Sequence, residues 1–466
     1  MSGNLAPDLP NASLSVGRTR LNAWYGLRYA SAPARFAAAR PASGRLAASR
    51  LLDIPIFPQL PGKLAAAMGH GQANPQSEDA FYANVWAPQN AQGLPVLFFI
   101  HGGAWMTGGG AMPWYDGSRL AAQGMVVITV NYRLGALGHL ASPQAAPQEL
   151  PLPAGDLLLA LQWAAEHAAH FGGDPTRITL AGQSAGGWYA HLLSTLPQTR
   201  GLVHRIALLS MGTREPWPQA RQDAITHWVQ AHLPDHDLLH VDARQLMQTA
   251  QSALAHLPES PRPNLAYAPA AFLPVASSGL PAALLQADWA ARACHAEAVY
   301  LRYTSDESAS FFFQSPHHLH ATQDDVDRAL ATWNDADIPP VLRPHGRYDG
   351  AACGLSPYRQ LVTASSWRQF QRFPNEYANA MRAAGRPVCL ETFSESSPLP
   401  DLHAGHCLDL PFQFGNRTAW LDAPMLQDMD TDRFDRISED LISRLSHFAT
   451  SRQAPDQDKV RITSST

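Results

Sequence analysis

The chain has 466 residues, of which 45% are hydrophobic and 16% are charged, and its formal net charge at pH 7 is -5. This composition is typical of a globular protein with a large buried core and excludes a disordered chain. Because no run of Lys or Arg forms a basic stripe, we expect no nucleic acid partner. No apolar stretch approaches the length of a membrane span and the N-terminal segment lacks a signal-peptide pattern, so we expect no membrane partner and a cytoplasmic location.

Short runs rich in β-branched and aromatic residues recur along the chain between helical patterns. Several are apolar on both faces, which is typical of strands in a mostly parallel sheet that helices cover on both sides. The sequence therefore predicts an α/β fold with a central, mostly parallel sheet. The runs begin at Phe81, Pro95, Met125, Arg177, His204, Ala298 and Arg386.

A helix is predicted over residues 155–171, where leucine and alanine recur at intervals of three or four residues. Gly172 and Gly173 follow directly and act as a stop signal. The positions that we expect to be buried are Leu158, Leu161, Ala165 and Ala168.

Two later segments, residues 212–290 and 312–370, are richer in Pro, His and Gln and lack the rhythm of strands. We expect them to be insertions that form a helical cap above the sheet. Since no repeat or strong linker divides the chain, residues 1–466 are predicted to form one domain with a polar, frayed tail at 452–466.

The stretch LAGQSAGGWYA, residues 180–190, places Ser184 between Gly182 and Gly186. The G-x-S-x-G pattern alone is weak because glycine and serine are common, and a serine in an ordinary glycine-rich turn is the alternative. Here a predicted buried strand precedes the serine and a helical pattern follows it, which is the context of a nucleophile elbow. The sequence thus predicts that Ser184 is a nucleophile.

A second glycine-rich stretch, FFIHGGAWMTGGG at residues 98–110, ends the strand predicted at Pro95. Glycines at a strand end let backbone N–H groups turn toward an oxygen that gathers negative charge. The functional interpretation is an oxyanion hole. Taken alone, the stretch is equally compatible with a glycine-rich loop that has no catalytic role.

The chain carries, in order, the motifs YGLRYASAP, SEDAFYANVWAP, FIHGGAW, NYRLGALGHL, GDLLLALQW, FGGDPTRITLAGQSAGG, TSDES and GHCLDLPFQFGN. In sequence and order these motifs resemble the type B carboxylesterases, the α/β-hydrolase family that also holds the cholinesterases. The resemblance spans residues 25–416. It implies an α/β-hydrolase fold, with a twisted, mostly parallel sheet flanked by helices, a small-molecule ester and water as reactants, and no cofactor.

The resemblance makes Ser184 the nucleophile, Glu307 of TSDES the acid and His406 of GHC the base. The chain order Ser, Glu, His is the one that this fold uses. Asp306 adjoins Glu307 and His403 lies three residues before His406, so spacing leaves both as rivals and the motif alignment decides.

The resemblance also places the oxyanion donors at the backbone N–H groups of Gly103, Ala104 and Ala185. Ala104 stands where many relatives have a third glycine. A backbone donor tolerates this change because its N–H group remains.

These residues predict a serine carboxylic-ester hydrolase that acts on neutral, fairly hydrophobic esters through an acyl-enzyme intermediate. An amidase or carbamate hydrolase with the same triad stays open, because the sequence does not separate these bonds. The scaffold also holds non-catalytic, esterase-like binding proteins, but these typically lose a triad member, whereas all three residues are present here. The natural ester, the acyl length and the oligomeric state stay open.

Four further positions depart from the family pattern, again without removing a catalytic atom. Gln183 replaces the common glutamate before the nucleophile, and Ala80 replaces a disulfide cysteine of secreted relatives. Ser308 and Cys407 replace the glycines that usually follow the acid and the base. Glycine serves where the backbone adopts conformations that a side chain disfavours, so these two changes put the geometry of both loops in question.

Other charged residues are interpreted as structural. The resemblance implies two ion pairs, Arg35 with Glu78 and Arg133 with Asp156.

Three histidines, His232, His236 and His240, have a spacing that suggests a metal site, but Pro234 interrupts the helix. We therefore expect a solvated polar segment and no metal. The four cysteines are few and irregularly spaced, so we expect no disulfide and a buried, reduced thiol at Cys389.

Overall fold

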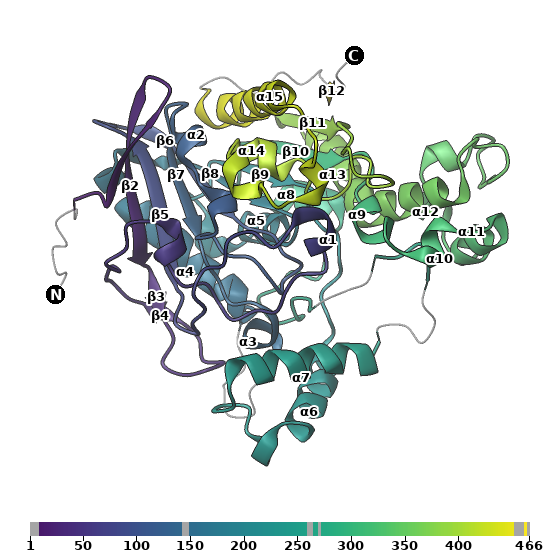
Figure 1. The fold of residues 1–466 in the computed structure, drawn as a ribbon, viewed down its shortest axis with the longest axis horizontal. Helices are drawn as coiled ribbons and strands as arrows, with labels where there is room; N and C mark the ends of the chain where they lie inside the picture. The colour runs from purple at the N-terminus through teal and green to yellow at the C-terminus, as the bar shows by residue number, and fades with distance from the viewer. Residues whose placement is uncertain (1–8, 142–148, 259–263, 269–271, 452–460, 464–466) are drawn as a thin grey trace.

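A ten-stranded sheet forms the centre of the molecule in the computed structural model, with the strand order β1-β2-β5-β7-β6-β8-β9-β10-β11-β12 (Figure 1). The structure describes residues 9–141, 149–258, 264–268, 272–451 and 461–463. The strands are β1 Ala12–Val16, β2 Thr19–Arg28, β5 Tyr82–Pro88, β6 Leu94–Ile100, β7 Val126–Val130, β8 Gly173–Gln183, β9 Arg205–Leu209, β10 Ala298–Thr304, β11 Val388–Phe393 and β12 Arg461–Thr463. Two short strands, β3 Ala30–Ser31 and β4 Arg40–Pro41, pair separately.

The sheet is parallel from β7 through β12, and β1, β2 and β5 form an antiparallel edge. All seven predicted strands are present, which confirms the α/β class. The two N-terminal strands were not predicted, because β1 alternates between half-buried and exposed residues and the first half of β2 is largely polar. Edge strands of this kind carry no continuous apolar run.

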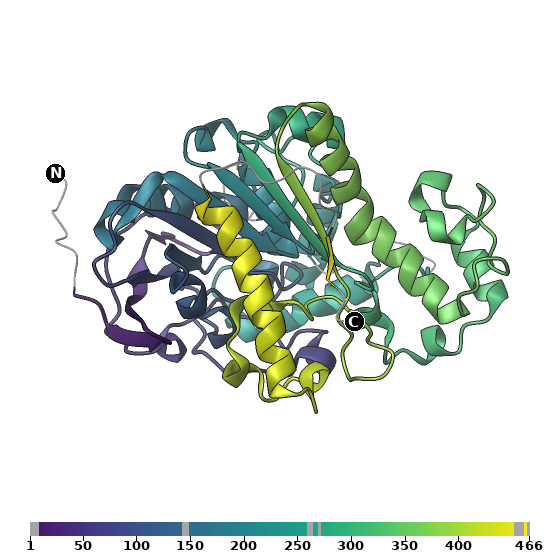
Figure 2. The ribbon, with the colours of Figure 1, turned by 90° about the horizontal axis from the view of Figure 1, so that it is seen from above.

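Helices cover both faces of the sheet, and strand side chains alternate between two cores. On β6, Val96, Phe98 and Ile100 face one core, while Leu97 and Phe99 face the other. Figure 2 shows α15, the long yellow helix, lying across the second face. The first core contains α3 Gly135–His139, α4 Leu152–His167, α5 Ala185–Leu193, α8 Ala287–Ala293 and α13 Arg372–Ala383. The second contains α1 Ala65–Met68, α2 Ser118–Ala121, α14 Leu410–Phe414 and α15 Thr431–Thr450.

The helix predicted over 155–171 is α4, followed by a 3-10 turn at Ala168–Phe171 that ends on left-handed Gly172. The predicted stop is therefore confirmed, and so is the burial of Leu161 and Ala168, but the other two predicted positions are displaced by one residue. Leu157 and Ala164 are fully buried, whereas Leu158 and Ala165 are half-buried. Residues 157–161 are all apolar, so the periodicity alone did not fix the orientation.

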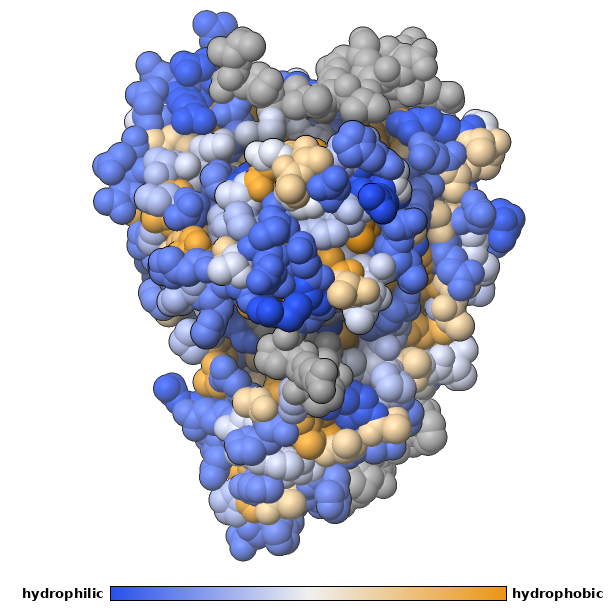
Figure 3. Space-filling model, turned by 90° about the vertical axis from the view of Figure 1, so that its right-hand side faces the viewer, coloured by the Kyte–Doolittle hydropathy of each residue, from blue (hydrophilic) through white to orange (hydrophobic). Residues whose placement is uncertain are grey.

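In their described residues, the regular secondary structure of the two predicted insertions is helical. In Figure 1, α6 and α7 pack together at the bottom of the molecule, and α10, α11 and α12 lie at its right. Figure 3 views this right-hand side, where hydrophobic residues occur in small groups among hydrophilic ones. The helices are α6 Gln219–Ala231, α7 Ala243–His256, α9 Ala309–Phe312, α10 Pro316–Leu319, α11 Gln323–Leu330 and α12 Pro357–Ser366, and α12 continues into a π-helical turn, Trp367–Gln371.

The expectation that Cys389 is buried was wrong, because this residue is half-buried on β11. Among the described residues, β12 pairs with residues 391–393 and not with the start of β11, where Cys389 lies. None of the four cysteines, all of which lie in the described ranges, forms a disulfide. Of the tail predicted at 452–466, only β12 is described.

Within the described ranges, no helix combines the length and the apolar character needed to cross a membrane.

Candidate active site

Ser184 occupies a sharp turn between β8 and α5. Its backbone has φ 55° and ψ -120°, an unusual conformation for a residue with a side chain, and its N–H continues the sheet by donating to the Leu209 carbonyl at 2.8 Å. A Cβ atom at Gly182 would lie 2.3 Å from the Gly186 carbonyl oxygen, and one at Gly186 would lie 2.2 Å from that of Ile100. The turn therefore requires both glycines of the motif.

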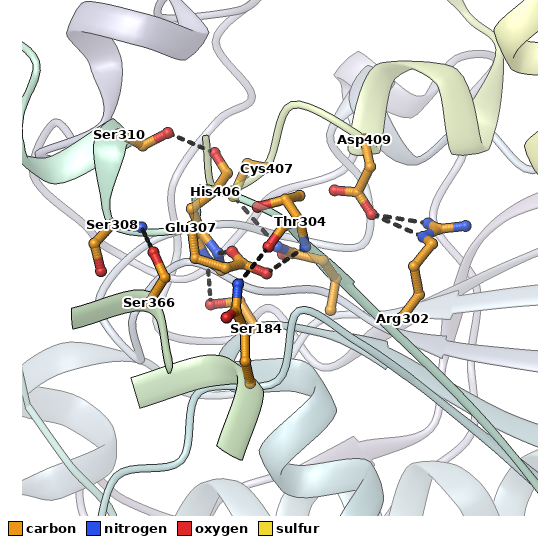
Figure 4. A network of polar contacts seen from close by, with 12 residues as sticks. Ser184, Arg302, Thr304, Glu307, Ser308, Ser310, Ser366, His406, Cys407 and Asp409 are labelled. Atoms are coloured by element: carbon orange, nitrogen blue, oxygen red, sulfur yellow. Dashed lines mark hydrogen bonds and ion pairs between the residues drawn. The ribbon is translucent and has the colours of Figure 1, made fainter. Parts of the chain in front are cut away.

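The structure brings Ser184, His406 and Glu307 into one hydrogen-bonded series (Figure 4). Ser184 Oγ lies 2.8 Å from His406 Nε2, and His406 Nδ1 contacts Glu307 Oε2. The other oxygen of Glu307 accepts the Thr304 N–H at 2.8 Å. Ser184 retains 8% of its exposure, while Glu307 is fully buried and His406 nearly so.

Three further contacts hold the loop that carries His406. The His406 N–H donates to the Glu307 carbonyl at 3.0 Å, and the Ser310 hydroxyl donates to the His406 carbonyl at 2.9 Å. Three residues later, Asp409 forms a buried ion pair with Arg302 of β10 at 2.9 Å (Figure 4). The base loop is thus tied both to the acid loop and to the sheet.

The rival residues face other partners. Asp306 pairs with Arg359 at 2.7 Å and accepts the hydroxyl of Ser305. The His403 ring packs beside Tyr358, and burial, together with the nearby Arg359, lowers its pKa. Neither residue takes part in the series that contains Ser184.

The environment of His406 favours the protonated imidazole. Burial by itself lowers the pKa of His406, but the adjacent Cys407 sulfur and the Glu307 carboxylate together raise it by more. The pKa of His406 therefore lies well above its usual value. The His406 imidazole therefore accepts a proton readily, and the Glu307 carboxylate stabilises the resulting positive charge.

The glycine-rich loop after β6 lies directly against the nucleophile. A Cβ atom at Gly102 would lie 3.0 Å from Ser184 Cβ, and one at Gly103 would lie 1.9 Å from the Thr107 carbonyl oxygen. Gly103 and Ala104 both have positive φ, 119° and 53°. Among the residues that the structure describes, none accepts a hydrogen bond from the amides of these two residues.

Ala185 is the first residue of α5, so its N–H has no acceptor within the helix. The predicted oxyanion donors thus lie on the two backbone segments next to Ser184. His101 supports the loop, because its ring stacks on Tyr132 with centroids 4.4 Å apart and its Nδ1 bonds to the Gly102 carbonyl at 2.7 Å. Burial lowers the pKa of His101 to about 4, so this ring is neutral at pH 7.

Aromatic side chains surround the series. The Phe370 and Phe311 rings lie 4.7 and 5.7 Å from the His406 ring. The space above Gly212 is bounded by Trp105 and Phe370, which a Cβ atom there would meet at 3.8 and 3.9 Å. Sequence reasoning missed both phenylalanines, and the π-helical turn that carries Phe370 has no sequence signal that we could have used.

Trp105 and Trp188 are packing residues. Both are buried and contact each other edge to face at 6.3 Å, and Trp188 Nε1 donates to the Arg214 carbonyl at 3.1 Å.

The two glycine replacements differ in backbone conformation. Ser308 has φ -75°, which any residue adopts, so its loop does not require glycine. Its N–H donates to Ser366 Oγ at 2.9 Å and its hydroxyl to Ser365 Oγ at 2.8 Å. Cys407, in contrast, has φ 70°, in the left-handed region that favours glycine.

Both expected ion pairs are confirmed. Arg133 pairs with Asp156 through two of its nitrogens, and both side chains are buried. Arg35 pairs with Glu78 in the same bidentate manner and also donates to the Leu238 carbonyl. These arginines join loops to the body of the fold.

The three histidines of the suggested metal spacing have other partners. His232 stacks on Trp228 with centroids 3.7 Å apart, His236 bonds to the Gln230 carbonyl, and His240 bonds to Asp237. In the described part of the chain, no group of three His, Cys, Asp or Glu residues is arranged to hold a metal ion.

A mostly parallel sheet with a serine at the turn after a central strand is the architecture of an α/β hydrolase. Residues 11–267 match the model of the carboxylesterase family. The chain belongs to this family, and the protein is a carboxylesterase.

Curated relatives agree with this assignment. The phenmedipham hydrolase of Pseudarthrobacter oxydans is 31% identical over 430 residues, which cover 89% of this chain and 83% of that protein. The probable N-octanoylanthranilate hydrolase of Rhodococcus erythropolis is 31% identical over 423 residues, covering 87% and 83%. The para-nitrobenzyl esterase of Bacillus subtilis is 39% identical over 202 residues, covering 41% and 40%.

Solved structures confirm the predicted fold and the resemblance to type B carboxylesterases. A PNB esterase superimposes with a TM-score of 0.73 at 26% identity, covering 94% of this chain and 88% of that chain. A carboxylesterase of Geobacillus stearothermophilus gives a TM-score of 0.72 at 26% identity with the same coverage.

Proposed function

We propose that this carboxylesterase hydrolyses neutral, fairly hydrophobic carboxylic esters, with Ser184 as nucleophile, His406 as base and Glu307 as acid. The observation that carries the proposal is the continuous series of contacts from Ser184 Oγ through the His406 ring to Glu307. A hydroxyl becomes an effective nucleophile when a base within hydrogen-bond reach takes its proton and a third group orients that base.

In the proposed reaction, Ser184 Oγ attacks the ester carbonyl carbon while its proton passes to His406 Nε2. The carbonyl electron pair moves to the oxygen, and the N–H groups of Gly103, Ala104 and Ala185 stabilise this oxyanion. Collapse of the tetrahedral intermediate breaks the bond to the alcohol, which takes the proton from His406 and leaves.

The remaining acyl-enzyme is cleaved by water. His406 removes a proton from the water as it attacks the acyl carbon and returns that proton to Ser184 Oγ, so the carboxylic acid leaves and the enzyme is restored. Glu307 holds the Nδ1 side of His406 throughout and stabilises the imidazolium that forms in each step. The scheme needs no cofactor.

The preference for neutral, hydrophobic esters rests on the residues around the series. Phe311, Phe370 and Trp105 are apolar, and the residue before the nucleophile is the uncharged Gln183. Gly212 and Phe370 belong to the segments 212–290 and 312–370, which we propose to form a cap over the site within a single domain.

A second candidate is the hydrolysis of amides or carbamates by the same residues. The relative named for N-octanoylanthranilate supports it, because that name denotes an octanoyl group on nitrogen. Matched p-nitrophenyl esters and p-nitroanilides of the same acyl group distinguish the two candidates. We expect a kcat/KM for the ester at least about a thousandfold above that for the anilide, and comparable values would favour the amidase.

The experiment that tests the residue assignment is the Ser184→Ala variant. Loss of a triad nucleophile lowers kcat on the order of 10⁶-fold while the fold is kept. A folded variant that retains more than a few per cent of the activity would contradict the assignment. Absence of ester turnover in the wild type would instead favour the non-catalytic, esterase-like binding protein.

A further inference from the structure

Two of the departures from the family pattern touch each other. Gln183 Nε2 lies 3.2 Å from Cys407 Sγ, although the residues are 224 positions apart in the chain. Gln183 is 1% exposed and Cys407 is 5% exposed, so water does not compete for this contact. The side chain of the residue before the nucleophile therefore donates to the residue after the base.

The other end of the same amide lies against the glycine-rich loop. A Cβ atom at Gly102 would lie 2.3 Å from Gln183 Oε1, so the amide fills the space that a side chain at Gly102 would need. Gly102 is the residue before the first predicted oxyanion donor, Gly103. One amide group thus contacts both loops that flank Ser184.

The backbone conformation of Cys407 indicates that contacts of its side chain stabilise the loop. A residue with a side chain is disfavoured at φ 70° and persists there only when its surroundings hold it in place. The sulfur packs within the second core and accepts the Gln183 amide, and these contacts oppose the unfavourable backbone conformation. A glycine at position 407 would remove both the conformational penalty and the contact.

We propose that Gln183 and Cys407 act as one positioning unit, which fixes the His406 loop and the Gly102–Gly103 segment relative to Ser184. The proposal rests on the proposed function, because it concerns the alignment of the same three residues. Small misalignments of a base or of oxyanion donors reduce the rate strongly, since the transition state depends on their geometry more than substrate binding does. The unit therefore acts on kcat and leaves KM nearly unchanged.

The test is a double-mutant cycle with Gln183→Met, which keeps the length of the side chain but has no N–H donor, and Cys407→Gly, which also relieves the backbone. The rate of p-nitrophenyl acetate hydrolysis is measured per active site, with the sites counted by a fluorophosphonate. We expect each single variant to lower kcat about tenfold, and the double variant to be no slower than the slower single one, because both remove the same contact.

Two variants separate positioning from a purely structural role. Cys407→Ser keeps an acceptor for the amide and is expected to retain kcat within about threefold of the wild type, a rescue that Cys407→Gly does not give. Cys294→Ala removes another buried thiol that is also 5% exposed and is expected to leave kcat per site unchanged.

The proposal is overturned if the two single losses multiply in the double variant. It is equally overturned if kcat per titrated site stays at the wild-type value in Cys407→Gly, so that only the melting temperature changes. Failure of the proposed function is distinguishable, because the wild type would then not be titrated by the fluorophosphonate at all.

Discussion

The acid loop, residues 304–310, and the base loop, residues 404–409, each place a non-glycine residue directly after the side chain that we assign to catalysis. In the acid loop, Ser308 has an ordinary backbone and is held by the hydroxyls of Ser365 and Ser366 at the end of α12. In the base loop, Cys407 has a left-handed backbone and is held by Gln183 at the end of β8.

The two loops therefore accommodate a non-glycine residue at equivalent positions in different ways. The acid loop fits a side chain without strain and is attached to the helical segment 312–370. The base loop keeps the glycine-like backbone and is attached to the central sheet. Substitutions around the two loops should therefore have effects of different size and kind.

The largest expected difference is between the two side chains that we assign as base and acid. We expect His406→Ala to lower kcat on the order of 10⁶-fold and Glu307→Gln on the order of 10⁴-fold, because the base takes the proton directly while the acid only orients and stabilises it. Steady-state kinetics with p-nitrophenyl acetate measures both, and circular dichroism checks the fold. Equal losses of kcat in the two variants would contradict the different roles that we assign to His406 and Glu307.

The pH dependence of kcat/KM tests the contact between His406 of the base loop and Glu307 of the acid loop. The wild-type kcat/KM should rise as His406 loses its proton, with a midpoint above 6.5, because the Cys407 sulfur and the Glu307 carboxylate outweigh the effect of burial and raise the pKa of His406. Removing the negative charge in Glu307→Gln makes the imidazolium less stable, so the midpoint should move to lower pH. Rate profiles between pH 5 and 9 measure this shift.

Asp306→Asn is the matched control for the pH profile. It removes the neighbouring carboxylate, which pairs with Arg359 and not with His406. An equal downward shift in this variant would show that the midpoint reports the general charge of the loop and not the contact with Glu307.

The attachment of the acid loop to α12 is expected to matter for stability more than for rate. Ser366→Ala leaves the buried N–H of Ser308 without its acceptor, which should lower the free energy of unfolding by about 1–3 kcal/mol. Because Thr304 still holds Glu307, we expect kcat to fall by no more than about threefold. Chemical denaturation and kinetics on the same preparation test both statements.

Ser438→Ala serves as the control for this substitution. Ser438 is fully buried on α15, and its hydroxyl has no hydrogen-bond partner among the described residues. Because its removal deletes no hydrogen bond and leaves no partner unsatisfied, it is not expected to lower the free energy of unfolding. If Ser366→Ala behaves like this control, the acid loop does not depend on α12.

The smallest expected effect concerns charge next to the nucleophile. We expect the wild type to prefer 3,3-dimethylbutyl butyrate, a neutral ester, to butyrylcholine, and Gln183→Glu to shift the kcat/KM ratio toward the cation by about threefold. A unit charge about 5 Å from a cation is worth on the order of 3 kcal/mol at an effective dielectric near 20, but position 183 is buried, and burial raises the pKa of a carboxyl group and keeps part of it neutral. A wild-type preference for butyrylcholine would contradict the expectation.

Much of the fold was predictable because buried parallel strands are continuous apolar runs. The helix α4 shows the limit of this reasoning, since its leucines fill adjacent positions and only packing decides that Leu157 is buried more deeply than Leu158. Local patterns likewise gave no sign that Cys389, near the start of β11, is only half-buried.

At the site, the motifs pointed to individual residues but did not show how the side chains of these residues contact one another. The sign of φ at Ser308 and Cys407 depends on tertiary contacts, and both positions looked alike in the sequence. The contact between Gln183 and Cys407 joins distant segments, and the place of Phe370 beside His406 depends on a π-helical turn. None of these features has a local sequence signal.

The central claim, that Ser184 is the nucleophile of an aligned series, is tested most directly by labelling with a fluorophosphonate followed by peptide mass spectrometry. The account predicts one adduct per chain, located on Ser184, with ester hydrolysis lost in proportion to labelling and no adduct in Ser184→Ala. An adduct on a different residue, or full ester hydrolysis by a protein in which Ser184 is completely labelled, would contradict it.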